Sequence, residues 1–237
     1  MLTESLHENQ KILRFVARAR GTESEQAESL EERMARAPVR PVEAKKHVFT
    51  EGDQRSHLYR VESGMICLYK VLPDGRRQVL GFAHPGDLLG LEPSGAHQFN
   101  AQATRLSRLR CLPWRVEYAA RRDPAFATAV WELIAQELAR AHDLLLAIGN
   151  RSATERVAAF LRGLARRNER EGDDPTVIVL SMTRSDIGDL LALTIETVSR
   201  IFGKLRRREI IDLAQSSHVH IRDIEALERL ATGAKDL

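Results

Sequence analysis

The sequence predicts an α+β protein in which an antiparallel β-roll is followed by a long helix and a winged helix-turn-helix domain. Short apolar segments separated by glycines fill residues 39–113, a helical period runs from 124 to 150, and two short helical stripes precede a hairpin pattern after residue 183. The 237 residues are enough for one large domain or two modest ones. We expect four parts: an N-terminal arm with a short helix (1–38), the β-roll (39–123), the long helix (124–150) and the helix-turn-helix domain (151–237).

The composition favours a packed protein in an aqueous compartment. Hydrophobic residues make up 43% of the chain and charged residues 29%. No apolar run approaches the roughly 20 residues of a membrane span. The start, MLTESLHENQKILRF, lacks the basic segment and apolar core of a secretory signal. We therefore expect a cytoplasmic protein with no membrane partner. The net charge of +3 permits nucleic-acid binding without indicating it.

The first 123 residues combine a polar arm with a strand-rich region. The arm has one apolar-periodic stretch around Ile12 and Phe15, which predicts a short helix. Beyond residue 39, Asp74-Gly75 separates LYKVLP from RRQVLGF and predicts a hairpin, because glycine readily adopts the positive φ that such turns need. Strands punctuated in this way are typical of an antiparallel sandwich or barrel.

The long helix carries an apolar seam. The seam residues follow one another at alternating spacings of four and three, as in a heptad repeat. Leu144, Leu146 and Ala147 lie on its flank, so one side can contact the sheets while the seam contacts a partner. A simple core helix is the alternative. We expect a homodimer formed through Ile134, Leu138, Ala141, Leu145 and Ile148.

The last 87 residues contain the signals of a compact helical domain with a hairpin. Ser152 and Glu155 form a capping box at the start of a helix, after a break at Gly149-Asn150. A short apolar strand, TVIVLSM, comes next. After the helical pair, REII, LAQSS and HVHIR form a two-stranded hairpin pattern, and a helix, DIEALERLATG, closes the domain.

Between these elements lies a pair of short helices with a tight turn. Thr183 and Thr194 are suitable N-caps, and Ala192-Leu193 supplies the turn, which is the helix-turn-helix arrangement. At roughly 100° per residue, the second helix has two opposite faces. Its apolar face holds Val198, Ile201, Phe202 and Leu205, and its polar face holds Glu196, Ser199, Arg200 and Gly203.

The polar face has the chemistry of DNA recognition. Arginine is the commonest reader of guanine, serine can donate to phosphates or base edges, and glutamate can accept from cytosine or orient the arginine. These residues fall in the first two turns, which enter the major groove in this motif, and a basic run suited to phosphates follows. The alternative is a solvated face with an ordinary Glu196–Arg200 ion pair. The candidate DNA-binding residues are Thr183, Arg184, Thr194, Glu196, Thr197, Ser199, Arg200, Lys204 and Arg207.

The segment MTRSDIGDLLALTIETVSRIFGKL resembles the DNA-binding signature of the CRP/FNR superfamily of bacterial transcription regulators, and the order of roll, helix and winged domain agrees over nearly the whole chain. The pattern ExxSR, here Glu196, Ser199 and Arg200, is similar to the FNR-type branch. The cyclic-AMP branch has arginine and glycine where this sequence has Ile195 and Ser199. The resemblance implies a cyclic-nucleotide-binding-like roll, an activator that contacts RNA polymerase, and a palindromic site of the TTGAT…ATCAA kind.

The resemblance also allows a prediction of whether the protein binds a cyclic nucleotide or an iron–sulfur cluster. Relatives that bind cyclic nucleotides present an Arg-Ser pair after a Gly-Glu, whereas this sequence has Phe99-Asn100 after Gly86-Asp87, and an apolar ring cannot replace a guanidinium against a phosphate. An iron–sulfur cluster needs four cysteines, and the chain has only Cys67 and Cys111. We expect two buried thiols and no cofactor or metal. The subgroup implied is FixK-like, serving low-oxygen or nitrogen-related genes.

Two details depart from FixK-like patterns. Ala192 occupies a turn position where relatives usually have glycine, and Thr183 stands where some carry a redox-sensitive cysteine.

Two alternatives remain for the β-roll. The same fold can sense haem, nitric oxide or a small molecule, for which lone histidines could act as ligands: His7, His47, His57, His84 and His97. A metal enzyme of the cupin type needs clustered His and Glu on the barrel strands. The one HxH, His218-Val-His220, falls in the expected wing instead. We therefore expect no enzyme.

Overall fold

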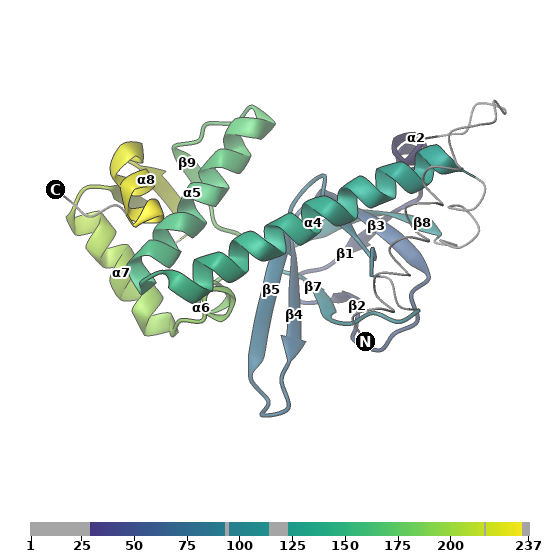
Figure 1. The fold of residues 1–237 in the computed structure, drawn as a ribbon, viewed down its shortest axis with the longest axis horizontal. Coiled ribbons are helices and arrows are strands. Elements are labelled where there is room, and N and C mark those ends of the chain that lie inside the picture. Colours follow the sequence, from purple (N-terminus) through teal and green to yellow (C-terminus); the bar gives the residue numbers. More distant parts are fainter. Residues whose placement is uncertain (1–28, 93–94, 114–122, 216, 234–237) are drawn as a thin grey trace, which may run out of the picture.

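The structure is a computed structural model that describes residues 29–92, 95–113, 123–215 and 217–233. A long helix, α4 (Pro124–Asn150), connects a β-roll to a smaller domain of helices and one short sheet (Figure 1). The expected fold class is confirmed. The short helix expected around Ile12 lies outside the described residues. None of the helices in the described ranges is both long and apolar enough to cross a membrane.

The β-roll is made of two four-stranded antiparallel sheets, with strand orders β1-β8-β3-β6 and β2-β7-β4-β5. Their inward side chains form one core that includes Val61, Ile66, Ala101 and Leu109. The strands are β1 (Val39–Val42), β2 (His47–Phe49), β3 (His57–Ser63), β4 (Ile66–Val71), β5 (Arg77–Ala83), β6 (Leu88–Leu89), β7 (Asn100–Ala103) and β8 (Ser107–Pro113).

Strands β4 and β5 form the hairpin predicted at Asp74-Gly75. Gly75 has a φ of +82°, which a residue with a Cβ rarely adopts. The Leu72 amide donates to the Arg76 carbonyl at 2.8 Å, and the Gly75 amide donates to the Leu72 carbonyl at 2.9 Å. The hairpin extends from the roll on the side that faces the helical domain (Figure 1).

A short helix, α2 (Leu30–Arg36), precedes the roll and was not predicted. Ser29 and Glu32 form a capping box at its start, and Leu30 and Met34 are buried one turn apart. They pack with Phe126 and Val130 of α4. Residues 29–37 therefore belong to the packed structure instead of forming a loosely held arm.

The C-terminal domain follows α4 after a break at Arg151-Ser152, two residues later than predicted, because α4 continues to Asn150. The predicted hairpin is present, and β9 joins it to give a three-stranded sheet of order β10-β11-β9. The elements are α5 (Ala153–Glu171), β9 (Val177–Val179), α6 (Arg184–Leu191), α7 (Ile195–Arg207), β10 (Ile211–Gln215), β11 (His218–Ile221) and α8 (Ile224–Thr232).

Candidate nucleic-acid interface

Helix α6 begins at a reciprocal capping box. The Asp186 amide donates to the Thr183 hydroxyl at 3.1 Å, and the Asp186 carboxylate accepts from the Thr183 amide at 2.9 Å. The capping role predicted for Thr183 is confirmed. Thr183 is an exposed residue at the positive end of α6, where helices bind phosphate groups.

The turn between α6 and α7 is closely packed. Ala192 adopts the left-handed conformation, with φ +53° and ψ +49°, so the turn carries a Cβ where glycine would be unstrained. A Cβ added at Gly188 would lie 2.7 Å from the Leu193 carbonyl oxygen. The close approach of the turn to α6 therefore requires glycine at position 188.

Helix α7 has the two faces that its sequence predicts. Val198, Ile201, Phe202 and Leu205 are buried against the rest of the domain. On the opposite side, the residues that we call the α7 polar face are exposed: Glu196, Ser199 and Arg200. Lys204 and Arg207 are also exposed, nearer the C-terminus of the helix.

Three side chains link the turn to the α7 polar face. The Thr197 amide donates to the hydroxyl of the N-cap Thr194 at 3.2 Å, and the Thr194 hydroxyl lies 3.1 Å from that of Thr197. The Arg200 guanidinium donates to the Thr197 hydroxyl at 3.2 Å. The arginine is thus oriented by Thr197, whereas the sequence suggested Glu196 for that role.

The Glu196 carboxylate interacts mainly with the start of its own helix. Its own backbone amide and the Thr194 hydroxyl hold its pKa below the ordinary value, and the charge of Arg200 contributes less. Glu196 is therefore ionised near neutral pH and can accept a hydrogen bond from a base. The simple Glu196–Arg200 ion pair considered from the sequence is not the geometry found, because Arg200 donates to Thr197.

Two other residues at the interface differ from expectation. The Arg184 guanidinium stacks over the Phe202 ring, 3.6 Å from its centroid, so it helps to pack α6 on α7. Ile195, which was not a candidate, is 46% exposed beside Glu196. An exposed apolar residue at the first turn of this helix was the available signal, since such a side chain can contact thymine methyl groups.

The wing presents a second polar edge. Val219 is buried while His218 and His220 are both partly exposed, as expected for alternation along a strand. Strands β10 and β11 of the three-stranded sheet follow the basic end of α7 in the chain, whereas β9 precedes α6.

The seam of α4 is largely exposed. The side chains of Ile134, Leu138 and Leu145 are 38%, 56% and 67% exposed. Monomeric soluble proteins seldom expose a continuous row of large apolar side chains. Trp131, at 61%, continues the row by one more position. Its spacing of three before Ile134 is the signal that the sequence prediction overlooked. Ala141 is exposed and Ile148 partly exposed.

The opposite flank of α4 packs within the chain. Phe126 and Val130 are buried against α2 and the roll, and Leu144 packs against the core of the helix-turn-helix domain. Of the flank residues expected from the sequence, Leu144 is packed, whereas Leu146 is 62% exposed, so the division into a packed flank and an outward seam is only partly present.

Phe99 and Asn100, which stand where the resemblance implies an Arg-Ser pair, do not offer the groups that a cyclic phosphate needs. Phe99 packs against the core of the roll, 6.0 Å from the Phe49 ring centroid. The Asn100 side chain accepts from the Glu51 amide at 3.1 Å and has no charge. Asp87, which stands in the place of the glutamate that the resemblance implies, accepts from Arg167 of α5 at 3.0 Å. These residues do not fit a cyclic nucleotide.

The two cysteines are buried and free. Burial raises the pKa of Cys67 to about 12 and also raises the pKa of Cys111. Both thiols are therefore protonated near neutral pH, which makes them poor metal ligands and poor nucleophiles.

The histidines have local partners within the roll. His97 is buried, lies 3.3 Å from a Glu92 carboxylate oxygen and stacks on Phe49. Across the described ranges, no cluster of three or more His, Cys, Asp or Glu side chains is placed to hold a metal ion. His47 and His57 contact Tyr69 and Ser56, and His7 lies outside the described residues.

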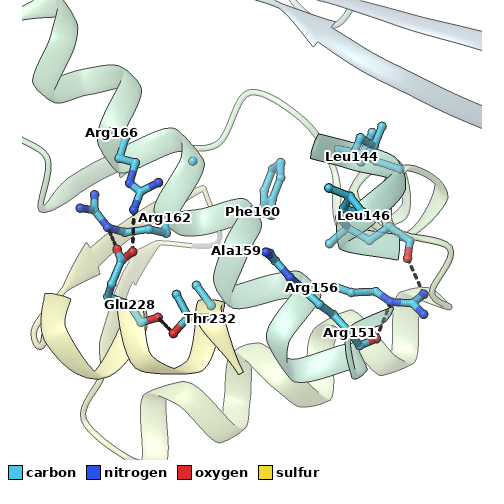
Figure 2. Close-up of a pocket in the computed structure, with 14 residues that line it drawn as sticks. Leu144, Leu146, Arg151, Arg156, Ala159, Phe160, Arg162, Arg166, Glu228 and Thr232 are labelled. Atoms are coloured by element: carbon cyan, nitrogen blue, oxygen red, sulfur yellow. Dashed lines mark hydrogen bonds and ion pairs between the residues drawn. The ribbon is translucent and has the colours of Figure 1, made fainter. Parts of the chain in front are cut away.

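A pocket of about 440 Å³ lies in the helical part of the molecule, between α4, α5, α6 and α8 (Figure 2). On one side Arg162 and Arg166 pair with Glu228, and on another Arg156 donates to the Leu191 carbonyl at 3.1 Å. The pocket shares no residue with the α7 polar face or the α4 seam, and it is not in the β-roll where a small ligand was considered.

Two family models and several known proteins are similar to this chain. A family model described as a Crp-like helix-turn-helix domain matches residues 155–230, and one described as a cyclic nucleotide-binding domain matches residues 39–118. The nitrogen fixation regulation protein FixK of Azorhizobium caulinodans is 40% identical over 185 residues, which is 77% of this chain and 75% of that protein. The chain belongs to the CRP/FNR family of transcription regulators.

Further relatives place it on the FNR and FixK side of that family. The fumarate and nitrate reduction regulatory protein of Escherichia coli is 32% identical over 195 residues, covering 81% of this chain and 78% of that protein. The structure of FixK2 from Bradyrhizobium japonicum matches with a TM-score of 0.78 and 33% identity, over 85% of this chain and 99% of that one. The predicted FixK-like resemblance is confirmed, and these CRP/FNR relatives are regulators, not enzymes.

Proposed function

We propose that this CRP/FNR regulator binds a palindrome of the TTGAT…ATCAA kind as a homodimer and activates transcription without a cyclic nucleotide or an iron–sulfur cluster. The observation that carries the proposal is the exposed α7 polar face on a helix whose other face is buried. Such a face at the first two turns of the second helix is positioned to enter the major groove.

Each group on this face has a matching partner on a base or phosphate. Arg200, oriented by Thr197, can donate to the O6 and N7 atoms of guanine, and each TTGAT half-site contains one guanine. Glu196 can accept from a cytosine amine, and Ile195 can contact a thymine methyl group. Contacts to phosphates are assigned to Thr183, Arg184, Thr194, Ser199, Lys204 and Arg207.

Two half-sites require two copies of α7. Helix α4 provides the surface for this, because Leu138 and Leu145 form an exposed apolar row that a second copy can cover. In this proposal residues 124–150 are the dimerisation helix, residues 39–123 a sensor-like roll and residues 151–237 the DNA-binding domain. The dimer would place its two reading helices about 34 Å apart.

The groups at the ligand positions support a regulator without a cyclic nucleotide or an iron–sulfur cluster. Phe99 and Asn100 offer no cation to a cyclic phosphate, and two buried thiols cannot ligate a four-thiolate cluster. The regulator would then be active as it folds, in the cytoplasm, and would recruit RNA polymerase. Control of low-oxygen or nitrogen-related genes is the role that its FixK relatives suggest.

The test is binding of purified, effector-free protein to a fluorescent TTGAT…ATCAA duplex and to a scrambled duplex, at one defined salt concentration. We expect at least about a thousandfold preference for the palindrome. Equal binding to both duplexes would contradict the proposal. An absorption spectrum of the same sample distinguishes the alternative, since a Soret band would indicate a haem sensor.

A further inference from the structure

Strand β5 of the roll lies directly against α6 of the helix-turn-helix domain (Figure 1). The Arg77 guanidinium on β5 donates to one carboxylate oxygen of Asp186 at 2.5 Å, and the same nitrogen lies 3.8 Å from Asp189. An ion pair thus joins the two domains at the first turn of α6.

The other carboxylate oxygen of Asp186 belongs to the capping box. It accepts from the Thr183 amide at 2.9 Å and from the Thr183 hydroxyl at 2.8 Å. Burial raises the pKa of Asp186, but the Thr183 amide and Arg77 outweigh this and hold it below the usual range. One ionised carboxylate therefore connects Arg77 of the roll to Thr183, a residue assigned to DNA.

Arg77 is itself held in place within the roll. Its guanidinium carbon lies 4.3 Å from the centroid of the Tyr69 ring, and its second terminal nitrogen lies 3.0 Å from the Cys67 sulfur. The side chain is 31% accessible, so the pair with Asp186 is only partly screened by water. A charge-assisted bond in this setting is stronger than the usual surface ion pair.

The surrounding interface is continuous. The side-chain amide of Gln78 donates to the Asp189 backbone carbonyl at 2.6 Å, and the Arg105 guanidinium donates to the Ser181 hydroxyl at 3.0 Å. Met65, Cys67 and Val79 of the roll are buried in the same apolar cluster as the core of the helix-turn-helix domain.

This interface leaves the reading helix uncovered. The polar contacts to the roll come from α5, α6 and the segment before α6, while Glu196, Ser199 and Arg200 of α7 remain exposed. In Figure 1, α7 lies at the outer edge of the molecule, away from the two sheets of the β-roll. The contact therefore holds the domain in an orientation in which DNA can reach α7.

We propose that Arg77 is a positioning residue for DNA binding, which fixes the orientation of α6 and α7 relative to the roll and α4 through Asp186. The inference rests on the proposed function. A palindrome is read only when both α7 helices lie at the correct separation and angle, so a domain free to rotate binds it with reduced affinity.

Arg77→Met is the test, with Arg76→Met as the matched control. Arg76 is on the same hairpin, carries the same charge and pairs locally with Asp74. If loss of the ion pair leaves about one tenth of molecules correctly oriented, affinity for the palindrome falls about tenfold. Affinity for a scrambled duplex should stay equal to that of Arg76→Met, and Arg77→Lys should restore part of the loss. Thermal unfolding shows whether each variant is folded.

A second measurement needs no DNA. Spin labels on Lys46→Cys and Glu225→Cys, in dimers diluted with unlabelled protein, report the distance between the roll and the helix-turn-helix domain. The native thiols are buried and should not react. We expect a narrow distribution of label-to-label distances for the parent protein and for Arg76→Met, and a broad distribution for Arg77→Met.

The outcomes separate the two proposals. Equal palindrome affinity for the two methionine variants, or equally narrow distributions, would overturn the role of Arg77. If the parent protein has no preference for the palindrome while Arg77→Met broadens the distribution, the assigned DNA site is wrong and the positioning contact still holds.

Discussion

At the scale of single residues, the helix-turn-helix geometry depends on hydroxyl caps and one close glycine. Thr183 and Thr194 could be predicted as caps because capping is a local interaction over three residues. The hydrogen bond from Arg200 to Thr197 and the stacking of Arg184 on Phe202 could not, since rotamers of long side chains depend on their surroundings.

Gly188 offers a direct test of the turn. Gly188→Ala forces a Cβ to 2.7 Å from the Leu193 carbonyl oxygen, and we expect a loss of about 1–3 kcal/mol in unfolding free energy. The control is Gly163→Ala, in the exposed middle of α5, where an added Cβ meets nothing within 4 Å. It should stabilise the protein by about 0.5–1 kcal/mol. Denaturant unfolding measures both, and equal effects would refute the close approach.

Arg207 should behave as a phosphate contact. It is exposed at the last turn of α7, beyond the α7 polar face. Arg207→Ala should weaken binding to palindromic and scrambled duplexes by the same factor and reduce the slope of log affinity against log salt by about two, about one for each protomer of the dimer. Titrations at several salt concentrations check this. A loss confined to the palindrome would instead assign Arg207 to a base.

At the scale of elements, those with a clear periodic pattern could be predicted from the sequence. A very short helix and a strand pairing between distant segments could not. The β4–β5 hairpin and the two faces of α7 follow from local turn chemistry and helical period. Helix α2 has only seven residues and was missed despite its capping box. The pairing of β9 with β11 is a contact across about 40 residues, which no local pattern specifies.

The α4 seam makes a prediction about assembly. Leu138→Asp with Leu145→Asp places two charges in the exposed apolar row, and we expect monomers because each charge would lose its water in a dimer contact. Sedimentation velocity measures the mass. Leu106→Asp, an equally exposed leucine on the roll, is the control and should remain dimeric. A dimer that survives the double substitution would remove the seam from the assembly.

At the scale of the whole molecule, the family and its order of domains could be predicted from sequence, but the contact between the domains could not. The ion pair between Arg77 and Asp186 joins residues 109 positions apart. No spacing rule connects two such charges, because their meeting depends on how the roll and the helices pack. The same holds for Arg167 and Asp87, which are 80 positions apart.

In the proposed function the effector-free dimer reads its palindrome through α7, and a double-mutant cycle between Arg200 and the guanine of each half-site tests this contact directly. Affinities are measured for parent and Arg200→Ala protein, each with the TTGAT…ATCAA duplex and with a duplex whose two G·C pairs are replaced by A·T. We predict that either change alone costs about 1–3 kcal/mol per half-site, and that the second change costs little once the first is made. Fully additive losses would contradict the account.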